Sequence, residues 1–445
     1  MATINVFARW RPLSQPEAKR GELNRKTLSD RPPLLAVSMQ PQAPAEGRSW
    51  TSSPAFHAVF EPEDDNHKVY NDVIAPNIPK VLRGENCSVF AYGHSGSGKT
   101  HTILGYDYDQ NSQKLGLCLA AAKQLFDALY DLNEKRRGEE ELGIGLSLFE
   151  LRKKSAFDLL NHHNQCHIRE GPDGKVHIRG ETEILAGGKV RVRPIVQRLC
   201  WTFESFQQEL VQALSQRTTG VSTVHDQSSR THAVIELEVI NQSLIDARQA
   251  LFDRQSELVP VGKRATDIRI EEESKAYMQL ADGRWGPNPD YQINQERIDM
   301  AEAEKAQYEA HVTAAEQKIE AILEASAFPC LGAKMVFVDL AGAEFYDDNG
   351  TTRPQTTRQT PQERQEGRQI NTDLLALKEV MGAWSQGQKR IPFRSSTLTM
   401  ALREHFMSAG KGNSTIIVTI SPATDQYKAT LNSLKYASLV GAARV

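Results

Sequence analysis

Residues 93–100 read Gly93-His94-Ser95-Gly96-Ser97-Gly98-Lys99-Thr100, which matches the phosphate-loop pattern G-x-x-x-x-G-K-[ST]. The apolar run that ends at Tyr92 predicts a buried strand before this loop, and the residues from Lys99 onward can open a helix. In that setting the loop amides and the helix N-terminus bind phosphate, Lys99 reaches the β- and γ-phosphates, and the Thr100 hydroxyl binds Mg²⁺. A Gly- and Ser-rich turn without a ligand is the alternative. The full match in this context favours a site for a nucleoside triphosphate.

The composition is that of a globular protein with one large or two modest domains. The chain has 445 residues, of which 39% are hydrophobic and 24% charged, and its formal net charge is −3. It contains no run of eighteen apolar residues and no signal-peptide pattern at its N-terminus, so we expect no membrane partner. The near-neutral net charge gives no general attraction to nucleic acid, so we expect no nucleic-acid partner either. Five scattered cysteines favour a reducing compartment over a disulfide framework: Cys87, Cys118, Cys166, Cys200 and Cys330.

Strands and helices alternate along the chain, which predicts an α/β three-layer fold with a central, mostly parallel sheet. The expected strands are residues 4–8, 87–92, 145–150, 233–240, 335–340 and 414–420, and residues 166–193 predict a β-ribbon. The expected helices are residues 66–82, 117–132, 370–384, 396–406 and 430–441. Residues 31–54 predict a long loop or a poor hairpin. A nucleotide is then expected at the carboxyl ends of the strands.

The segment 241–330 differs in character from the rest of the chain. Its apolar positions step by three and four residues, as in a heptad seam: Ile298, Ala301, Lys305, Tyr308, Val312, Ala315, Ile319 and Ile322. A weaker version of the pattern occupies Leu244, Arg248, Leu251, Gln255 and Leu258. We predict an inserted helical hairpin of coiled-coil type with its loop near Gly283–Asp290, and a single helix packed on the core fits the pattern equally well.

The motif Ser228-Ser229-Arg230-Thr231-His232 places two hydroxyls and a guanidinium at the start of an expected strand. Ser229 is a candidate for the Mg²⁺ shell, and Ser228 is a candidate for contact with the γ-phosphate. Taken alone, a Ser-Ser-Arg triplet is more often a surface loop. Its interpretation therefore depends on a second motif.

That second motif is Asp339-Leu340-Ala341-Gly342-Ala343-Glu344, directly after the apolar strand 335–340. An aspartate at the end of such a strand is placed to hold Mg²⁺ through water. The Gly342 amide is a candidate sensor of the γ-phosphate, and a glycine there permits the following loop to swing. Glu344 and Arg230 carry opposite charges, so we expect them to close over the phosphate as a latch.

The order of five motifs resembles the kinesin motor domain over almost the whole chain, apart from the insertion. These are residues 6–13, residues 89–93 leading to 98–102, residues 228–232, residues 339–342 and residues 431–437. The resemblance implies a kinesin-like motor domain over 1–445 with a helical insertion at 241–330. It implies an ATPase that uses ATP and Mg²⁺ and that is stimulated by microtubules.

The resemblance also implies roles for particular residues. Arg9, Arg11 and Pro12 would flank the adenine, and His101 would stack near it. Ser228 and Ser229 belong to the family's switch I, and Asp339, Gly342 and Glu344 belong to its switch II. Arg230 and Glu344 would position the attacking water. Asn371 would lie at the start of the helix that relays the nucleotide state to the track.

Within the family, residues 366–371, 374–379 and 392–394 are most similar to the internal-motor kinesins, which depolymerise microtubules. The chain departs from the usual family pattern at His225 (normally Asn), Ala343 (normally Ser), Thr372-Asp373 (normally Lys-Ser) and Thr397 (normally Lys). Tubulin is acidic, so lost cations on the track-facing side should weaken binding. Other cations are expected to compensate: Arg364, Arg368, Lys378, Lys389, Arg390 and Arg394. For the arginines, a solvated loop without a partner is the alternative.

Three functions compete at this point. The first is a microtubule-stimulated ATPase that converts γ-phosphate release into movement or depolymerisation. The second is a non-motile module that binds nucleotide and docks on tubulin or a partner. The third is an unrelated phosphate-loop enzyme, such as a small-molecule kinase, which would transfer phosphate to an acceptor. The resemblance favours the first. It further implies a cytoplasmic protein of the microtubule cytoskeleton, with the spindle as one setting, that is monomeric over 1–445 and dimerises through segments beyond Val445.

Overall fold

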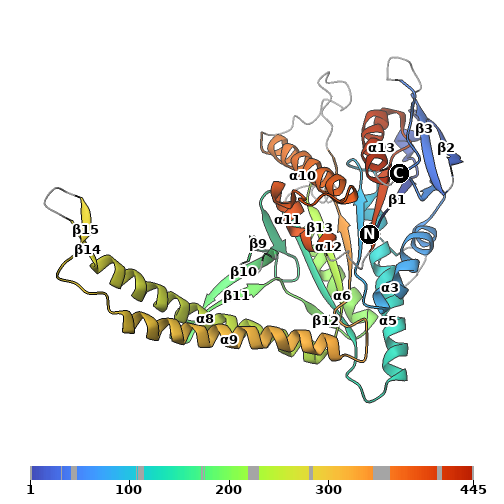
Figure 1. The fold of residues 1–445 in the computed structure, drawn as a ribbon. Coiled ribbons are helices and arrows are strands. Elements are labelled where there is room, and N and C mark those ends of the chain that lie inside the picture. The colour runs from blue at the N-terminus through green and yellow to red at the C-terminus, as the bar shows by residue number, and fades with distance from the viewer. Residues whose placement is uncertain are drawn as a thin grey trace. The chain divides into compact units, whose positions relative to one another are not determined.

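The computed structural model describes residues 3–31, 33–41, 48–106, 108, 115–171, 174, 176–218, 230–279, 284–343, 361–407 and 413–442. The chain divides into two compact units (Figure 1). The first comprises residues 1–179, 195–240 and 328–445, and the second comprises residues 180–194 and 241–327. Within the described ranges, no helix combines the length and the apolar character that crossing a bilayer requires.

The first unit is built on one mixed sheet. Its neighbouring parallel strands are β5 (Ala58–Phe60), β1 (Thr3–Trp10), β17 (Asn413–Ile420), β6 (Cys87–Tyr92) and β16 (Lys334–Asp339). The sheet continues from β16 through antiparallel β13 (His232–Ile240), β7 (Gly143–Arg152), β8 (Ser155–Asp158) and β9 (Asn164–Glu170). β12 (Arg198–Cys200) pairs with β7, and β10 (Val176–Ile184) pairs with β9 over residues 176–179. The sheet is therefore mixed and not mostly parallel as predicted, and its parallel half carries the phosphate loop.

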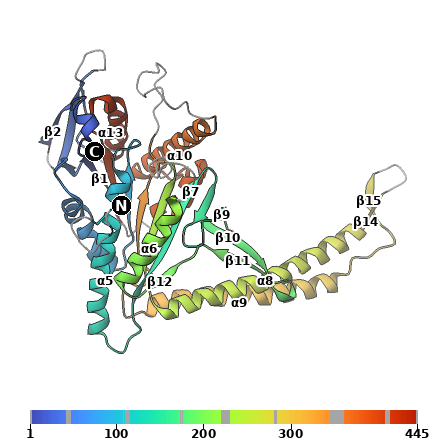
Figure 2. The same cartoon turned by 180° about the vertical axis from the view of Figure 1, so that it is seen from behind.

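Helices cover both faces of this sheet, so the predicted three-layer α/β fold is confirmed. One face packs against α10 (Pro361–Ser385), α11 (Thr397–Ala401), α12 (Arg403–Met407) and α13 (Tyr427–Ala442), which lie in front in Figure 1. The other face carries α4 (Lys99–Ile103), α5 (Leu117–Lys135) and α6 (Phe203–Thr218), and α5 and α6 lie in front in the reverse view (Figure 2). Aromatic pairs join sheet and helix, as where Tyr92 stacks on Tyr436 with centroids 4.1 Å apart.

The helix predicted at residues 66–82 is present but interrupted. It consists of α2 (Asn66–Val69), a π turn η2 (Tyr70–Ile74), a 3-10 turn η3 (Ala75–Asn77) and α3 (Ile78–Leu82). Pro76 and Pro79 cause the change, because proline has no N–H for the regular ladder and its ring clashes with the preceding turn. The predicted inner face survives, since Val69, Val73 and Ile74 are buried.

Of the two structures expected for residues 31–54, a long loop or a poor hairpin, the structure shows hairpin pairing. β2 (Asn24–Arg31), β3 (Leu34–Gln40) and β4 (Trp50–Thr51) form a separate antiparallel sheet. Val37 and Met39 are buried on one face of β3, and the Val37 amide donates to the Ser52 hydroxyl at 2.9 Å. Alternation over so few residues was masked in the sequence by the prolines and glutamines that flank it.

The second unit contains two long helices, so the segment is a pair and not a single helix. α8 (Gln242–Lys275) and α9 (Gln295–Ala325) run side by side and are joined through the short strands β14 (Tyr277–Gln279) and β15 (Trp285–Pro287) (Figures 1 and 2). β11 (Val190–Pro194) also belongs to this unit. Arg264 pairs with Glu304 at 3.4 Å, and Arg269 pairs with Glu302 at 3.0 Å, across the two helices.

The predicted seam on α9 faces its partner helix. Ile298 and Ala301 are buried, and the six later seam positions are half-buried beside mostly exposed neighbours. The seam on α8 was placed wrongly at one position, since Gln255 is exposed and Ser256 is buried instead. Ser256 can occupy the packed side because its hydroxyl donates to the Phe252 carbonyl at 2.7 Å.

The chain leaves and re-enters the first unit at neighbouring positions. The Val239 amide donates to the Ala333 carbonyl at 3.0 Å, and the Gly332 amide donates to the Val239 carbonyl at 2.8 Å. We therefore predict that replacing residues 242–327 by a short Gly-Ser linker leaves the first unit folded, because a tight connection can join the paired strands. Circular dichroism should show a single cooperative thermal transition. Loss of that transition would mean that the second unit is needed for the core.

Candidate active site

The phosphate loop follows β6, all six residues of which are buried. Gly96 and Gly98 adopt φ of 73° and 100°, a region that side chains disfavour. A Cβ on Gly93 would lie 2.3 Å from the Thr419 carbonyl oxygen, so β17 fixes the start of the loop against β6. The sequence therefore folds into the tight turn that the phosphate-loop pattern predicts.

Lys99 lies inside the loop that precedes it. Its Nζ donates to the carbonyls of Gly93 at 3.2 Å and His94 at 2.8 Å. Burial lowers the pKa of Lys99 to about 8, with the Asp339 carboxylate opposing that shift. An ammonium held by carbonyl dipoles in a buried turn suits an anionic ligand, because phosphate oxygens would replace weaker partners.

Asp339, at the end of β16, meets the first turn of α4. Its Oδ2 accepts from the Thr100 hydroxyl at 2.8 Å and from Arg217 at 3.1 Å. Its Oδ1 is buried and has no hydrogen-bond partner within the part of the chain that the structure describes. A hydroxyl and a carboxylate with a spare oxygen are donors that Mg²⁺ prefers, so these residues fit the expected ion. The described ranges hold no cluster of three or more His, Cys, Asp or Glu that could bind a metal ion.

The segment after β16 lies directly on the phosphate loop. The Ala343 amide donates to the Gly93 carbonyl at 3.2 Å, and a Cβ on Gly342 would lie 2.6 Å from Ser95 Cα. On its other side, the Ala341 amide donates to Nδ1 of buried His232 at 3.0 Å. The structure thus brings Lys99, Thr100, Asp339 and Gly342 together.

The residues expected near the adenine lie at the end of β1 (Arg9), just after it (Arg11 and Pro12) and on α4 (His101). Arg9 is buried, and its guanidinium donates to Asn66 at 2.6 Å and to the Thr102 hydroxyl at 2.9 Å. Burial lowers the pKa of Arg9 to about 10. Arg9 therefore links β1 to α2 through Asn66 and to α4 through Thr102, and its contact with a base stays a prediction.

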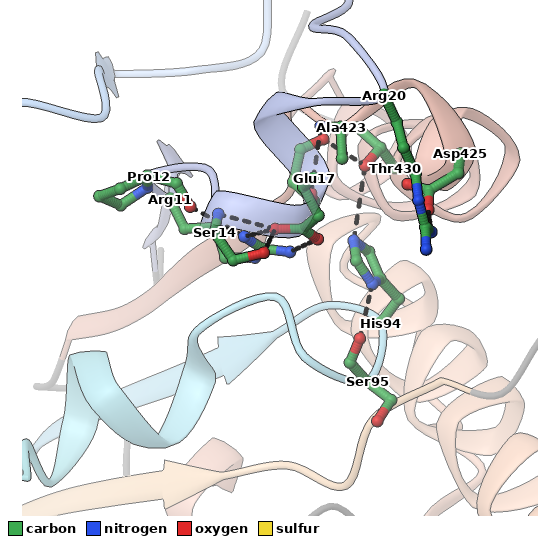
Figure 3. Close-up of polar contacts among 11 residues, drawn as sticks. Arg11, Pro12, Ser14, Glu17, Arg20, His94, Ser95, Ala423, Asp425 and Thr430 are labelled. Carbon is green, nitrogen blue, oxygen red and sulfur yellow. Dashed lines mark hydrogen bonds and ion pairs between the residues drawn. The ribbon is translucent and has the colours of Figure 1, made fainter.

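Arg11 and His94 lie at the junction between β1, the phosphate loop and α13 (Figure 3). Arg11 pairs with Glu17, with NH1 2.8 Å from Oε2, and also donates to the Pro12 carbonyl. His94 Nδ1 donates to the Ser95 carbonyl at 2.8 Å, and its Nε2 is 3.5 Å from the Thr430 hydroxyl oxygen. Burial lowers the pKa of His94 to about 4, so its ring is neutral at pH 7.

His101 is an exposed residue of α4, and its ring centroid lies 5.6 Å from that of Tyr106. Aromatic rings of this kind stack on planar ligands, and the contact of His101 with an adenine stays a prediction. Partial desolvation of the ring, with the Arg9 guanidinium nearby, lowers the pKa of His101. The lower pKa favours the uncharged ring for such stacking.

A buried charge network behind the site was not predicted from the sequence. Arg217 of α6 lies 3.1 Å from Asp339 and 3.8 Å from Glu150 of β7. Glu150 in turn lies 2.7 Å from His163 Nε2. A charged residue inside the apolar run 146–151 was a signal for Glu150. Nothing in the sequence pattern distinguished Arg217 from a surface arginine.

Three predicted site residues, Ser228, Ser229 and Glu344, lie outside the described residues, as does His225. Arg230 is described, and it lines a small pocket with Arg152, Lys153 and Glu366, where Arg152 pairs with Glu366 at 2.8 Å. The proposed latch between Arg230 and Glu344 therefore stays a prediction.

The six cations expected to face tubulin lie on or near α10. Arg364 and Arg368 share its exposed stripe with Thr372, and Lys378 is half-buried. Lys389 and Arg390 follow the helix and are exposed. Arg394 is exposed but is bound by both oxygens of Glu170 at 2.9 Å, so its charge is largely compensated.

We predict that Gly342→Ala lowers nucleotide hydrolysis by about tenfold or more, because the added methyl cannot approach Ser95 as the glycine does. Phosphate release measured at saturating ATP tests this. Gly262→Ala is the matched control, since a Cβ there meets nothing within 4 Å. Equal rates for Gly342→Ala and the unmodified chain would show that the contact is dispensable.

We predict that protonation of His232 in the unfolded state makes the folded state less stable as the pH falls. Burial, with Arg217 and Lys99 nearby, lowers its pKa to about 3. The unfolded ring has a pKa of about 6.5, so the unfolded state binds the extra proton and stability falls as pH drops below that value, by about 2 kcal/mol at pH 5 for each such histidine. His232→Asn keeps an acceptor near Nδ1 without titrating. Urea unfolding at pH 7 and pH 5 should show a smaller loss for His232→Asn, and an equal loss would contradict this account.

Comparison with known proteins agrees with the geometry. The family model described as "Kinesin motor domain" matches residues 9–261 and 307–442. Kinesin-like protein KIF24 of Homo sapiens is 26% identical over 440 residues, which cover 99% of this chain and 24% of that protein. Kinesin-like protein KIN-13A of Oryza sativa subsp. japonica is 27% identical over 440 residues, which cover 99% of this chain and 41% of that protein.

Solved structures show the same fold. The motor domain of the Kar3-like kinesin from Ashbya gossypii superposes with a TM-score of 0.59 at 19% identity, over 98% of this chain and 99% of that one. The chain spans less than half the length of the curated relatives named above. The family match covers most of its residues. This chain belongs to the kinesin motor domain family.

Proposed function

We propose that this chain is a microtubule-binding, microtubule-stimulated ATPase that couples the loss of the γ-phosphate to a change in its tubulin contact. The observation that carries the proposal is the contact of Gly342 and Ala343 with the phosphate loop, since a ligand in that loop would act directly on this segment, which precedes α10 in the sequence. Membership of the kinesin family supports both the ATPase and the track.

At the nucleotide, each group has a distinct task. Lys99 exchanges the carbonyls of its own loop for phosphate oxygens. Thr100 and Asp339, with Ser229, would hold Mg²⁺, which neutralises charge on the β- and γ-phosphates when bound. Arg230 and Glu344 position the attacking water. Positioning and preorganised charge supply most of the rate in such a reaction.

In this proposal α10 carries the change outward. Ile370, Leu374 and Leu377 are buried on its inner side and pack the helix against the core. Its outer stripe presents Arg364 and Arg368 to solvent. A positive stripe of this kind complements the acidic surface of tubulin, and such complementarity acts on encounter as well as on affinity.

Movement and depolymerisation are both outputs of this coupling. Similarity of residues 366–371 to the internal-motor kinesins favours depolymerisation. A non-motile, nucleotide-dependent binder is the second candidate. Two features favour it because they lower the net positive charge near α10. Thr372 stands where the family usually has a lysine, and the charge of Arg394 is compensated by Glu170.

We predict that Lys389→Ala combined with Arg390→Ala raises the microtubule concentration for half-maximal ATPase about fivefold, or ~1 kcal/mol, because two exposed cations are lost. Basal hydrolysis should not change, and the effect should shrink at high salt. Lys19→Ala with Lys26→Ala, two exposed lysines near the N-terminus, is the charge-matched control.

The assay is steady-state ATPase activity with and without taxol-stabilised microtubules, with polymer mass followed by sedimentation. Stimulated hydrolysis with intact polymer supports movement, and a shrinking polymer fraction supports depolymerisation. Nucleotide-dependent co-sedimentation without stimulation would support the non-motile binder. Neither stimulation nor co-sedimentation would contradict microtubule function altogether.

A further inference from the structure

The distal end of the α8–α9 hairpin exposes large apolar side chains. We define the hairpin tip as residues 264–279 and 284–304, which include β14 and β15. Trp285 is 71% exposed, Met300 69% and Tyr277 57%. Ile268, Met300 and Ala301 line a groove of about 560 Å³ between α8 and α9. An exposed apolar patch with a groove of this size marks a binding surface in a protein that otherwise buries its core.

The tip is ordered by its own polar bonds. Buried Glu272 accepts from the Tyr291 hydroxyl, from the Asn294 amide at 3.1 Å and from Arg297 at 2.7 Å. Asn294 also caps α9, where its side chain accepts from the Arg297 amide at 3.0 Å. The groove is therefore formed before any partner binds, which reduces the ordering cost of association.

The charge of the tip restricts what can occupy the groove. Residues 264–304 contain ten acidic and five basic residues, a net charge of −5 in a chain whose total is −3. Four of the basic residues are paired within the hairpin: Arg264, Arg269, Lys275 and Arg297. Several carboxylates carry no ion pair within the described ranges, and Glu296 among them lines the groove: Asp267, Glu273, Asp290, Glu296 and Asp299.

We infer that the hairpin tip is a docking surface for a basic amphipathic helix of a partner protein. Such a helix would place its apolar side against Met300 and Ile268 and its lysines or arginines beside Glu296. A second copy of the tip brings like charges together. Acidic tubulin and anionic membranes are repelled for the same reason. This surface is independent of the nucleotide site and adds a binding activity to the proposed ATPase.

The test measures fluorescence anisotropy of a labelled synthetic Leu/Lys amphipathic helix with the full chain at physiological salt. A scrambled Leu/Lys peptide and a Leu/Glu helix with the same apolar face are the peptide controls. Met300→Ser removes apolar surface, and Glu296→Gln with Asp299→Asn removes two charges. Glu316→Gln with Glu320→Gln, exposed on the far part of α9, is the charge-matched control.

We expect the Leu/Lys helix alone to bind, and each tip variant to weaken it about fivefold or more while the control variant and basal ATPase stay unchanged. Equal binding of the scrambled peptide, or no effect of the tip variants, overturns the inference. Dimerisation in sedimentation velocity that Met300→Ser abolishes would assign the surface to a second copy. Microtubule co-sedimentation that falls with the tip variants would assign it to the track. Failure of the ATPase alone would bear on the proposed function and not on this surface.

Discussion

The first unit depends on the contacts of the buried Asp339 carboxylate with Thr100 and Arg217. The carboxylate is buried at the end of a central strand, where an uncompensated charge would cost several kcal/mol. Thr100 and Arg217 compensate one oxygen, and Glu150 compensates Arg217 in turn. The phosphate loop, β7, α6 and β16 are tied together by these few contacts. The second oxygen is buried without a partner among the described residues, and the proposed Mg²⁺ would supply that partner.

The same strand end lies against the phosphate loop, where the proposed coupling to a ligand would begin. Gly342 permits a close approach to Ser95 that no other residue allows, and the chain continues from there toward α10. Neutral His232 holds the opposite side of the segment through the Ala341 amide. A contact between packed backbone segments is either made or broken, so in the proposed coupling a small change at the phosphates would give two discrete positions of the segment. This is how the fold could support the coupling that we propose for a kinesin motor domain.

A structural feature could be predicted from the sequence where residues close together in the chain determine it, and not where distant residues do. The phosphate loop, Asp339 and Gly342 stand in short motifs beside strongly apolar strands, so their position could be predicted. The seam from Ile298 to Ile322 could be predicted because helix packing repeats along the chain. Arg217 and Glu150 could not be paired, because their contact depends on how distant elements cross. The break in residues 66–82 was missed because helical periodicity outweighed Pro76 and Pro79.

Hydrogen exchange of the full chain, in ADP and in a non-hydrolysable ATP analogue with Mg²⁺, tests the central claim most directly. The account predicts that amide protection changes together in two segments, residues 340–343 and α10, because the segment on the phosphate loop and the helix respond to one event. Changes confined to the phosphate loop, with α10 protected equally in both nucleotide states, would contradict it.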